Sequence, residues 1–481
     1  MILNLEKCRY NTAIFPTDWR YSASLLGLKK YLDYYDFEYE KYTVGYNSEF
    51  IQKKDDLMGM EGILYNKEDI TEEKYLLYAE TNWNIDFQHI RIEEKLKQDD
   101  FNDDEIKEIN SLLNGSESNT ILKKLFKDVR FDGKNKIHIS EMIRENRLDI
   151  IRETYRNKLF MYKNFANKSL LFTSSNDHCR LVGYNIDENR KSKSVSYFFT
   201  KKTFVQNDCL EFDFIPFAFS KTRDAIFINN NYSVDLLEQT FNELNQSLDK
   251  ISNFKNSNMM TSLLKMLAKS SGFIKYDVEV IMKNQGKDYF ENVYLRENSI
   301  SAMARIENKI DLMNFKYELS KDYWFDLQEE ITNICLNNLK FDGLIEFMFK
   351  IRDQDNVNKS YVKKIIDYLI EFNFYMKGEE KMDKIQNCEI LREDIEKAKK
   401  CAFLVAKTLP ENKVKSYRQK LISALVFHDY DRVCEILLQL SGFSDISMPF
   451  AYKIYENPAN AKNLAFAFAN GLEKIENSSE K

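Results

Sequence analysis

The sequence predicts an α+β protein, in which a large mixed N-terminal body with short β-strands in mid-chain is followed by an all-α C-terminal helical bundle. The 481 residues include only 13 glycines and 5 prolines, well below the usual shares of about 7% and 5%, which favours helices over tight hairpins. Short β-like runs begin near Leu170, and every segment beyond Asp353 has the pattern of a helix. The length allows two or three domains and a large core.

The first predicted helix begins at Trp19, with Asp18 placed as its N-cap residue. Its apolar positions recur at i, i+3, i+7 and i+10, the spacing of one buried helical stripe: Leu25, Leu28, Leu32 and Tyr35. The small residues of the same helix are Ser22, Ala23, Ser24 and Gly27. Because a glycine inside a helix costs about 1 kcal/mol relative to alanine, Gly27 indicates that another backbone packs closely here. We expect this helix to be buried in the core.

The middle of the chain is expected to pass from helices to short strands. Residues 91–165 have the pattern of charged amphipathic helices. The predicted strands are Ser194–Phe199, Thr203–Val205, Leu210–Phe219, Ala225–Ile228 and Ile274–Met282. Ser233 is placed to cap a helix after the fourth of these strands.

The segment Asp353–Lys359 is the best linker candidate, and it divides the chain into a body at residues 1–353 and a helical bundle at residues 354–481. The predicted bundle helices are Ile365–Tyr375, Ile390–Lys407, Val414–Gln439 and a last segment near Leu464–Ile475. Pro410, Pro449 and Pro458 separate these helices. Short connections between helices are typical of a bundle.

Composition limits the classes of function. The net charge is −6 and the sequence pI is about 5.6, which argues against a protein that coats nucleic acid with its whole surface, while a local basic groove remains compatible. High usage of Lys, Asn, Ile, Tyr and Phe is typical of an AT-rich genome, so the aromatic content is not taken as a sign of base stacking. Seven unpatterned cysteines, with no signal peptide or long apolar run, predict a cytoplasmic protein that does not enter a membrane.

The motifs of common enzyme classes do not occur in the sequence. The four histidines are scattered, and no phosphate-binding loop, dinucleotide fingerprint or zinc-protease pattern is present. His428-Asp429 matches the dipeptide of metal-dependent phosphohydrolases, but that chemistry needs further histidine and aspartate ligands. We therefore expect a protein that is not an enzyme and needs no cofactor.

The first of two basic stretches has no acidic residue and encloses the aromatic segment Tyr197–Phe199. Its basic residues are Arg190, Lys191, Lys193, Lys201 and Lys202. A β-hairpin with a basic tip would place these cations on a phosphate backbone. The alternative is a solvated loop beside a buried aromatic strand.

The second basic stretch runs from Lys397 to Lys420, with Glu411 as its acidic residue. Its basic residues are Lys397, Lys399, Lys400, Lys407, Lys413, Lys415, Arg418 and Lys420. On a helix Lys397, Lys400 and Lys407 fall within about 80° of one another, broadly opposite an apolar face. The pattern predicts a packed helix with a positive outer face, which either contacts nucleic acid or is simply solvated.

Cys179 and Cys209 flank the first basic stretch. A zinc ribbon uses a Cys-x-x-Cys pair at each end, which supplies four ligands in a tetrahedron. Here Val182 and Phe212 stand where the second cysteine of each pair would fall. Two thiols and the neighbouring His178 make a weak zinc site, so we expect no bound metal.

Several of these motifs together resemble the large subunit of type I CRISPR interference complexes (Cascade), closest to the type I-B/I-A branch. Members of that family often open with a Trp-led helix of small residues that ends in Leu-x-Gly-Leu, as Trp19–Leu28 does here. Many members carry two Cys-x-x-Cys pairs, where this chain departs with Cys179-x-x-Val182 and Cys209-x-x-Phe212, followed by a Pro-Phe-containing segment, Ile215–Phe219. The segment Phe227–Asn231 before a helix and the region around Tyr417–Leu440 are also similar.

The resemblance implies a non-catalytic subunit that recognises a short duplex motif beside the target (the PAM), helps to unwind the DNA and supports the displaced strand. It implies guide RNA and target double-stranded DNA as partners, together with Cascade backbone subunits and a separate helicase-nuclease. Small subunits made from the same gene, by an internal start at Met348, Met376 or Met382, are also implied. The cations of both basic stretches except Lys399 are the candidate nucleic-acid contacts, and the loop Asn229–Asn231 is a candidate reader of base edges.

Two other functions are compatible with the sequence. A helix-rich interaction scaffold or sensor of another bacterial defence system, with no nucleic-acid role, would fit the acidic net charge. A hydrolase with a dispersed active site would show turnover by the purified chain, and no motif favours it.

Overall fold

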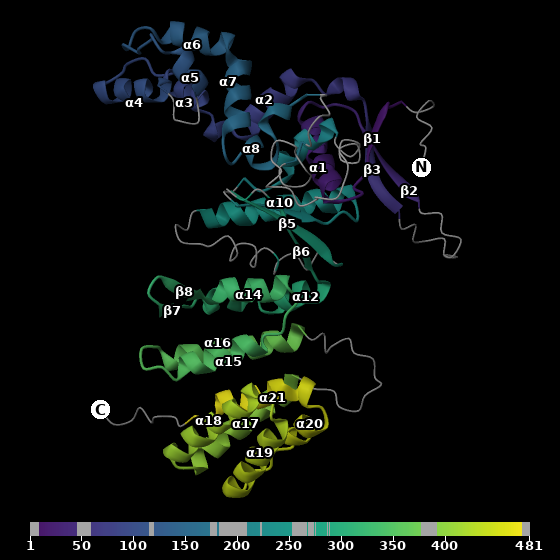
Figure 1. Cartoon of the computed structure of the whole chain (residues 1–481), viewed down its shortest axis with the longest axis vertical. Coiled ribbons are helices and arrows are strands. Elements are labelled where there is room, and N and C mark those ends of the chain that lie inside the picture. Colours follow the sequence, from purple (N-terminus) through teal and green to yellow (C-terminus); the bar gives the residue numbers. More distant parts are fainter. Residues whose placement is uncertain are drawn as a thin grey trace, which may run out of the picture. The chain divides into compact units, whose positions relative to one another are not determined.

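The computed structural model forms two compact units (Figure 1): unit 1 comprises Met1–Gln246 and Val278–Val293, and unit 2 comprises Ser247–Asp277 and Tyr294–Lys481. The residues that the structure describes are 9–45, 59–114, 120–173, 180–181, 209–221, 224–252, 267, 274, 276–285, 287, 289–376 and 392–473. The α+β class is confirmed, because short antiparallel strands in mid-chain precede a helical C-terminal region. The predicted boundary between residues 353 and 354 falls inside unit 2, and the roles assigned to its two sides stay predictions.

Unit 1 combines two small sheets with helices. Its strands are β1 (Thr12–Ile14), β2 (Glu40–Gly45), β3 (Gly59–Tyr65), β4 (Asp224–Asn229), β5 (Val278–Asn284) and β6 (Glu291–Leu295). Its helices are α1 (Trp19–Tyr34), α2 (Glu72–Asn82), α3 (Gln88–Lys95), α4 (Asp103–Leu113), α5 (Thr120–Leu125), α6 (Lys136–Glu145), α7 (Arg147–Asn157), α8 (Tyr162–Phe165) and the part of α10 (Val234–Ser252) up to Gln246. Single turns of 3₁₀ helix are η2 (Lys67–Asp69), η3 (Asn84–Asp86) and η4 (Lys168–Leu170), and a longer one is η6 (Leu210–Ala218).

The sheets of unit 1 have the strand orders β1-β3-β2 and β4-β5-β6. Strands β1 and β2 both pair antiparallel with β3, and β4 pairs antiparallel with β5. The charged helices predicted over residues 91–165 are confirmed and enclose a buried cluster of their own, shared by α3 to α7. The predicted cap is confirmed as well, since the Ser233 hydroxyl accepts a hydrogen bond from the Leu236 N–H at the start of α10 (3.1 Å).

The main core of unit 1 surrounds α1, which packs lengthwise against η6. The Ser24 hydroxyl donates to the Glu211 carbonyl, and the Lys30 ammonium donates to the Phe217 carbonyl (2.9 Å). Between these two contacts, a Cβ added at Gly27 would stand 2.0 Å from the Phe214 carbonyl oxygen. Residues 211, 214 and 217 align on η6 because a 3₁₀ helix has about three residues per turn. Gly27 is therefore required for the close approach that the sequence predicted.

The prediction of a strand over Leu210–Phe219 is wrong, because this segment is the 3₁₀ helix η6. Pro216 lies inside it, and a proline has no N–H to donate to a strand ladder. The carbonyls of Glu211 and Phe217 instead accept side-chain hydrogen bonds from α1. The strand predicted over Ala225–Ile228 is confirmed as β4, while the strand predicted over Ile274–Met282 begins at Val278, as β5. The predicted strands Ser194–Phe199 and Thr203–Val205 lie outside the described residues.

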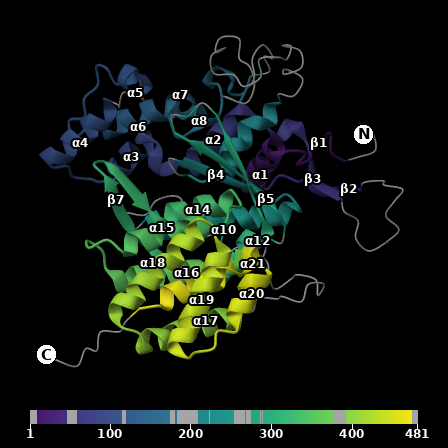
Figure 2. The ribbon, with the colours of Figure 1, turned by 60° about the horizontal axis from the view of Figure 1, so that its bottom comes forward.

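Unit 2 begins with α12 (Glu297–Arg305), α13 (Glu307–Ile310) and η7 (Asp311–Met313), which lead into a hairpin of β7 (Lys316–Ser320) and β8 (Tyr323–Asp326). The helices that follow are α14 (Leu327–Leu336), α15 (Asp342–Arg352), α16 (Lys359–Met376), α17 (Arg392–Thr408), α18 (Glu411–Val426), α19 (Tyr430–Ser444), α20 (Phe450–Glu456) and α21 (Pro458–Gly471). Helix α21 packs against α16, α17, α18 and α20, and residues 461–470 are all buried. The predicted C-terminal bundle is thus built around its last helix, among the yellow-green and yellow helices of Figure 2.

The prediction of one helix over Val414–Gln439 is wrong, since α18 ends at Val426 and α19 begins at Tyr430. His428 between them has a left-handed backbone, with φ of 56°. The Asp429 carboxylate then caps α19 by accepting a hydrogen bond from the Arg432 N–H (3.0 Å). The His428-Asp429 dipeptide is therefore a helix-to-helix turn, and its aspartate has a structural partner.

Candidate nucleic-acid interface

Three lysines of α17 lie on the outer face of the helix, as predicted, while Lys399 is half-buried and its ammonium lies 3.4 Å from the Asp367 carboxylate. Lys397, Lys400 and Lys407 are exposed, whereas Ile395 and Val405 on the opposite side are buried. The Lys397 ammonium lies 3.7 Å from Asp394 and 3.9 Å from Glu393, distances at which an exposed ion pair contributes little. Helix α17 therefore combines a packed inner face with a cationic outer face.

Helix α18 carries the rest of the second basic stretch. Lys413, Lys415 and Lys420 are exposed, but the Arg418 side chain is only 12% exposed and its guanidinium lies 2.6 Å from the Asp353 carboxylate. The positive charge of Arg418 is thus compensated within unit 2, which makes it the weakest nucleic-acid candidate of this stretch.

Three of the exposed lysines have uncompensated charges. Within the part of the chain that the structure describes, Lys400, Lys413 and Lys415 form no ion pair. The Lys407 ammonium lies 4.4 Å from the centre of the Phe403 ring, and that of Lys420 lies 5.3 Å from the Tyr417 ring. Uncompensated surface lysines on consecutive helices are the arrangement that neutralises backbone phosphates.

The first basic stretch, Arg190, Lys191, Lys193, Lys201 and Lys202, lies outside the described residues, as does Cys179. Next to Cys179, Arg180 is buried, and its guanidinium donates to the Asp213 carboxylate (2.8 Å) and to the Thr173 carbonyl (2.8 Å). The Tyr162 hydroxyl and the Phe172 N–H also donate to Asp213. Burial raises the pKa of the Asp213 carboxyl above its ordinary value, and the Arg180 charge opposes that rise. The segment Cys179-x-x-Val182, where the resembling family has a Cys-x-x-Cys pair, thus contributes Arg180 to a buried ion pair of the core.

Two smaller predictions, on the weak zinc site and on the base-reading loop Asn229–Asn231, also involve described residues. Cys209 is a half-buried thiol that forms no disulfide among the described residues, and these residues contain no group of three or more side chains that could hold a metal ion. The Asn229 and Asn230 amides are buried and donate to Glu279 (3.3 Å) and Thr240 (3.0 Å). These two asparagines stabilise the fold and are not placed to read base edges, which corrects that part of the prediction.

A pocket of about 540 Å³ lies at the N-terminus of α1. It is lined by Asp18, Arg20, Tyr21, Cys209 and Glu211 among others. The Arg20 guanidinium donates to Asp18 (3.1 Å) and lies 5.5 Å from the centre of the Phe212 ring, and Glu211 accepts from the Tyr65 hydroxyl (2.8 Å). Burial raises the pKa of Tyr21. Because Arg20 already pairs with Asp18 and Glu211 already accepts from Tyr65, the pocket chiefly fixes the start of α1 against η6.

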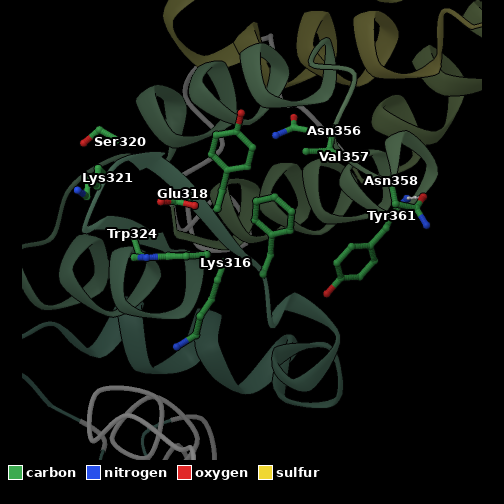
Figure 3. A pocket seen from close by; sticks show the side chains of 11 residues that line it. Lys316, Glu318, Ser320, Lys321, Trp324, Asn356, Val357, Asn358 and Tyr361 are labelled. Carbon is green, nitrogen blue, oxygen red and sulfur yellow. Dashed lines mark hydrogen bonds between the residues drawn. The ribbon is translucent and has the colours of Figure 1, made fainter.

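A second pocket, of about 520 Å³, lies between the β7–β8 hairpin and the segment that leads into α16. Figure 3 shows Trp324 and Lys316 on one side, with Asn356, Val357, Asn358 and Tyr361 on the other. Phe315, Tyr317, Glu318, Ser320 and Lys321 complete the lining. Sequence reasoning missed this site; its signal was the aromatic run Tyr323-Trp324-Phe325, directly after the Lys321-Asp322 turn.

The fold and the exposed lysines together define an α+β protein that carries exposed lysines on the consecutive C-terminal helices α17 and α18. The sequence profile of the CRISPR-associated protein Csx8 family matches residues 10–255 and 242–472, which is nearly the whole chain. The chain therefore belongs to the CRISPR-associated Csx8 family. No curated protein and no solved structure shows a significant match. The prediction of a CRISPR-associated protein is confirmed at this level. Among the described residues, no helix is long and apolar enough to cross a membrane.

Proposed function

We propose that this chain is the non-catalytic large subunit of a type I (I-B/I-A-like) CRISPR interference complex in the cytoplasm. In this role it recognises the PAM duplex, promotes unwinding of the target and supports the displaced strand. Its partners are the guide RNA, target double-stranded DNA, Cascade backbone subunits, small subunits made from the same gene, and a separate helicase-nuclease. Sequence reading itself is carried out by guide pairing, which leaves the protein to contact the PAM and the backbone.

The observation that carries the proposal is the set of exposed lysines on α17 and α18 in a chain of the CRISPR-associated Csx8 family. This set is called the lysine face below and comprises Lys397, Lys400, Lys407, Lys413, Lys415 and Lys420. The chain is acidic as a whole, so the exposed lysines Lys400, Lys413 and Lys415, which form no ion pair among the described residues, are a local feature, as expected of a subunit that contacts a strand at one place. Binding strength to such a strand follows the local charge, since each neutralised phosphate releases counterions.

Co-purification with tagged neighbouring subunits tests the proposal directly. We expect a complex with bound RNA of uniform length and, where an internal start is used, a short C-terminal fragment. An isolated chain without RNA would instead favour the interaction scaffold.

The lysine face is tested by the triple variant Lys400→Glu, Lys407→Glu and Lys413→Glu within the complex. We expect a weaker footprint on the displaced strand and a salt slope smaller by about 2, at roughly 0.7 for each phosphate contact on a single strand. The matched control, Lys123→Glu, Lys124→Glu and Lys127→Glu, makes the same charge change at exposed positions of unit 1. A wild-type footprint and slope in the first variant would contradict the assignment.

A further inference from the structure

The β7–β8 hairpin of unit 2 presents large aromatic side chains to solvent. Trp324 is 59% exposed and Tyr323 is 64% exposed, although they neighbour each other on one short strand. In the hairpin register Trp324 lies opposite Glu318, and Tyr323 lies opposite Ser320. Single exposed apolar residues are ordinary, but Trp324 also lines a pocket together with Phe315 and Tyr317, whereas Tyr323 is not part of that lining.

Three aromatic rings of the pocket, those of Phe315, Tyr317 and Tyr361, are held in place by contacts within unit 2. The Phe315 and Tyr317 rings are within 10° of parallel, with centres 6.4 Å apart. The Tyr361 hydroxyl donates to the carbonyls of Leu312 (2.9 Å) and Asn314 (3.0 Å), and this fixes its ring beside Phe315. A preorganised site loses less conformational entropy on binding.

Phe325 anchors the hairpin to the rest of unit 2, because it is buried and packs on Phe347 with ring centres 4.8 Å apart. Trp324, its neighbour on the strand, points to the other face, since successive strand residues alternate between faces. Phe325 is therefore a core contact of the hairpin, whereas the Trp324 ring remains available to a ligand.

The polar groups of the pocket suit a nucleotide. Lys321 at the hairpin turn is exposed and forms no ion pair among the described residues, while Lys316 shares its charge with Asp326 (2.9 Å). On the other wall, Asn356 and Asn358 are exposed; an asparagine amide both donates and accepts, as the edges of bases require. Glu318 is an exposed carboxylate within the same lining, and it would repel a phosphate.

We propose that this pocket binds an unpaired nucleobase of a single-stranded nucleic acid. The base stacks on the aromatic wall that includes Trp324, and its backbone passes Lys316 and Lys321. Stacking on aromatic rings tolerates every base because each has a π-face. With Glu318 in the lining, affinity comes mainly from stacking and depends little on salt, in contrast to the lysine face of α17 and α18. The inference rests on the proposed function, because that function brings an unpaired strand to the protein.

The test uses the full chain and fluorescently labelled 20-nucleotide oligothymidine and oligouridine, followed by anisotropy. Replacing Trp324 by alanine is expected to weaken binding by about 5- to 140-fold, the range for loss of one base–aromatic stack. Glu318→Gln is expected to tighten binding. The matched control Tyr455→Ala removes a similarly exposed aromatic from α20 and is expected to bind within about twofold of wild type.

Tryptophan fluorescence gives a direct readout of the contact. The chain has three tryptophans, of which Trp19 and Trp83 are 3% and 4% exposed, so Trp324 is the one in contact with solvent. A stacked base is expected to quench its emission with the same midpoint as the anisotropy, and Trp324→Phe is expected to abolish the quenching. Stronger quenching by oligothymidine or by oligouridine identifies the displaced DNA strand or the guide RNA as the source of the base.

Wild-type affinity in Trp324→Ala together with unquenched Trp324 emission would overturn the proposal. If the lysine variants of α17 and α18 still weakened binding of the same oligonucleotides, the proposed function would stand and only the role of this pocket would be wrong. If Trp324→Ala released a neighbouring protein subunit while leaving oligonucleotide binding unchanged, the pocket would be a protein contact, which also overturns the proposal.

Discussion

Replacing Gly27 by alanine is expected to destabilise unit 1, although alanine is the best helix former. The added Cβ would stand 2.0 Å from the Phe214 carbonyl oxygen and 2.9 Å from the carbonyl carbon. Both atoms belong to the backbone of η6, so no side-chain rotation relieves the overlap. The 3₁₀ helix must move away from α1, and the hydrogen bonds that Ser24 and Lys30 donate to its carbonyls are strained as a result.

The size of the effect follows from opposing contributions. Alanine gains about 1 kcal/mol in helix propensity over glycine, whereas overpacking a core costs about 1 to 3 kcal/mol. Two hydrogen bonds flank the overlap, and each contributes about 1 kcal/mol when intact. The overlap and the weakened hydrogen bonds together cost more than the gain in helix propensity. We therefore expect the free energy of unfolding to fall by about 1 to 3 kcal/mol.

The assay is urea denaturation followed by tryptophan emission in a Trp324→Phe background. The remaining fluorophores, Trp19 and Trp83, are both buried in the core of unit 1, and Trp19 packs on Phe219 just after η6 (ring centres 6.3 Å apart). The control is Gly442→Ala in α19, followed by circular dichroism. A Cβ at Gly442 meets nothing within 4 Å, so this variant is expected to gain up to about 1 kcal/mol. A Gly27→Ala protein as stable as wild type would refute the packing argument.

Two further predictions concern buried charges of unit 1. Burial lowers the pKa of Lys30 from 10.5 to about 7, so the folded chain loses a proton above pH 7 that the unfolded chain keeps. Wild type should therefore gain stability relative to Lys30→Met as the pH rises from 7 to 10, and a constant difference in urea midpoints would contradict this. Asp213→Ala leaves the Arg180 charge buried without its carboxylate, which is expected to cost about 3 to 5 kcal/mol. The double variant Asp213→Leu with Arg180→Met removes both charges and should recover much of the lost stability in thermal melts. A double variant no more stable than Asp213→Ala would speak against an uncompensated charge as the cause.

The parts of the fold that sequence could predict are those specified by neighbouring residues. Helix α1 follows from its cap at Asp18 and the spacing of its leucines, and the reason for Gly27 follows from the free-energy cost of a glycine inside a helix. The outer lysines of α17 follow from the 3.6-residue period alone. In each of these cases, local spacing determines both the element and the face that it buries.

The parts that could not be predicted depend on contacts between distant segments. The apolar segment Leu210–Phe219 has the composition of a buried strand, and its 3₁₀ form depends on α1, which lies nearly 200 positions earlier. The Arg180–Asp213 pair is likewise invisible to local patterns, because neither residue stands in a periodic run. The pocket of the β7–β8 hairpin escaped prediction because the aromatic content of the chain is high, so the sequence does not distinguish the rings that line a pocket from those that are buried or singly exposed.

The lysine face and the hairpin pocket would hold a strand by different forces, and this difference makes the two proposals separable. Lysines without acidic partners bind through counterion release, so their contribution falls steeply as salt rises. A base stacked on Trp324 gains binding free energy from dispersion, while Glu318 repels the phosphates of the same strand. The contribution of stacking therefore persists at high salt. The loss of affinity caused by Trp324→Ala should therefore remain nearly constant from 50 to 200 mM salt, while that caused by Lys400→Glu with Lys413→Glu should shrink. If the loss of affinity shrank with rising salt to the same extent in both variants, the pocket would act through charge, and the stacking argument would fail.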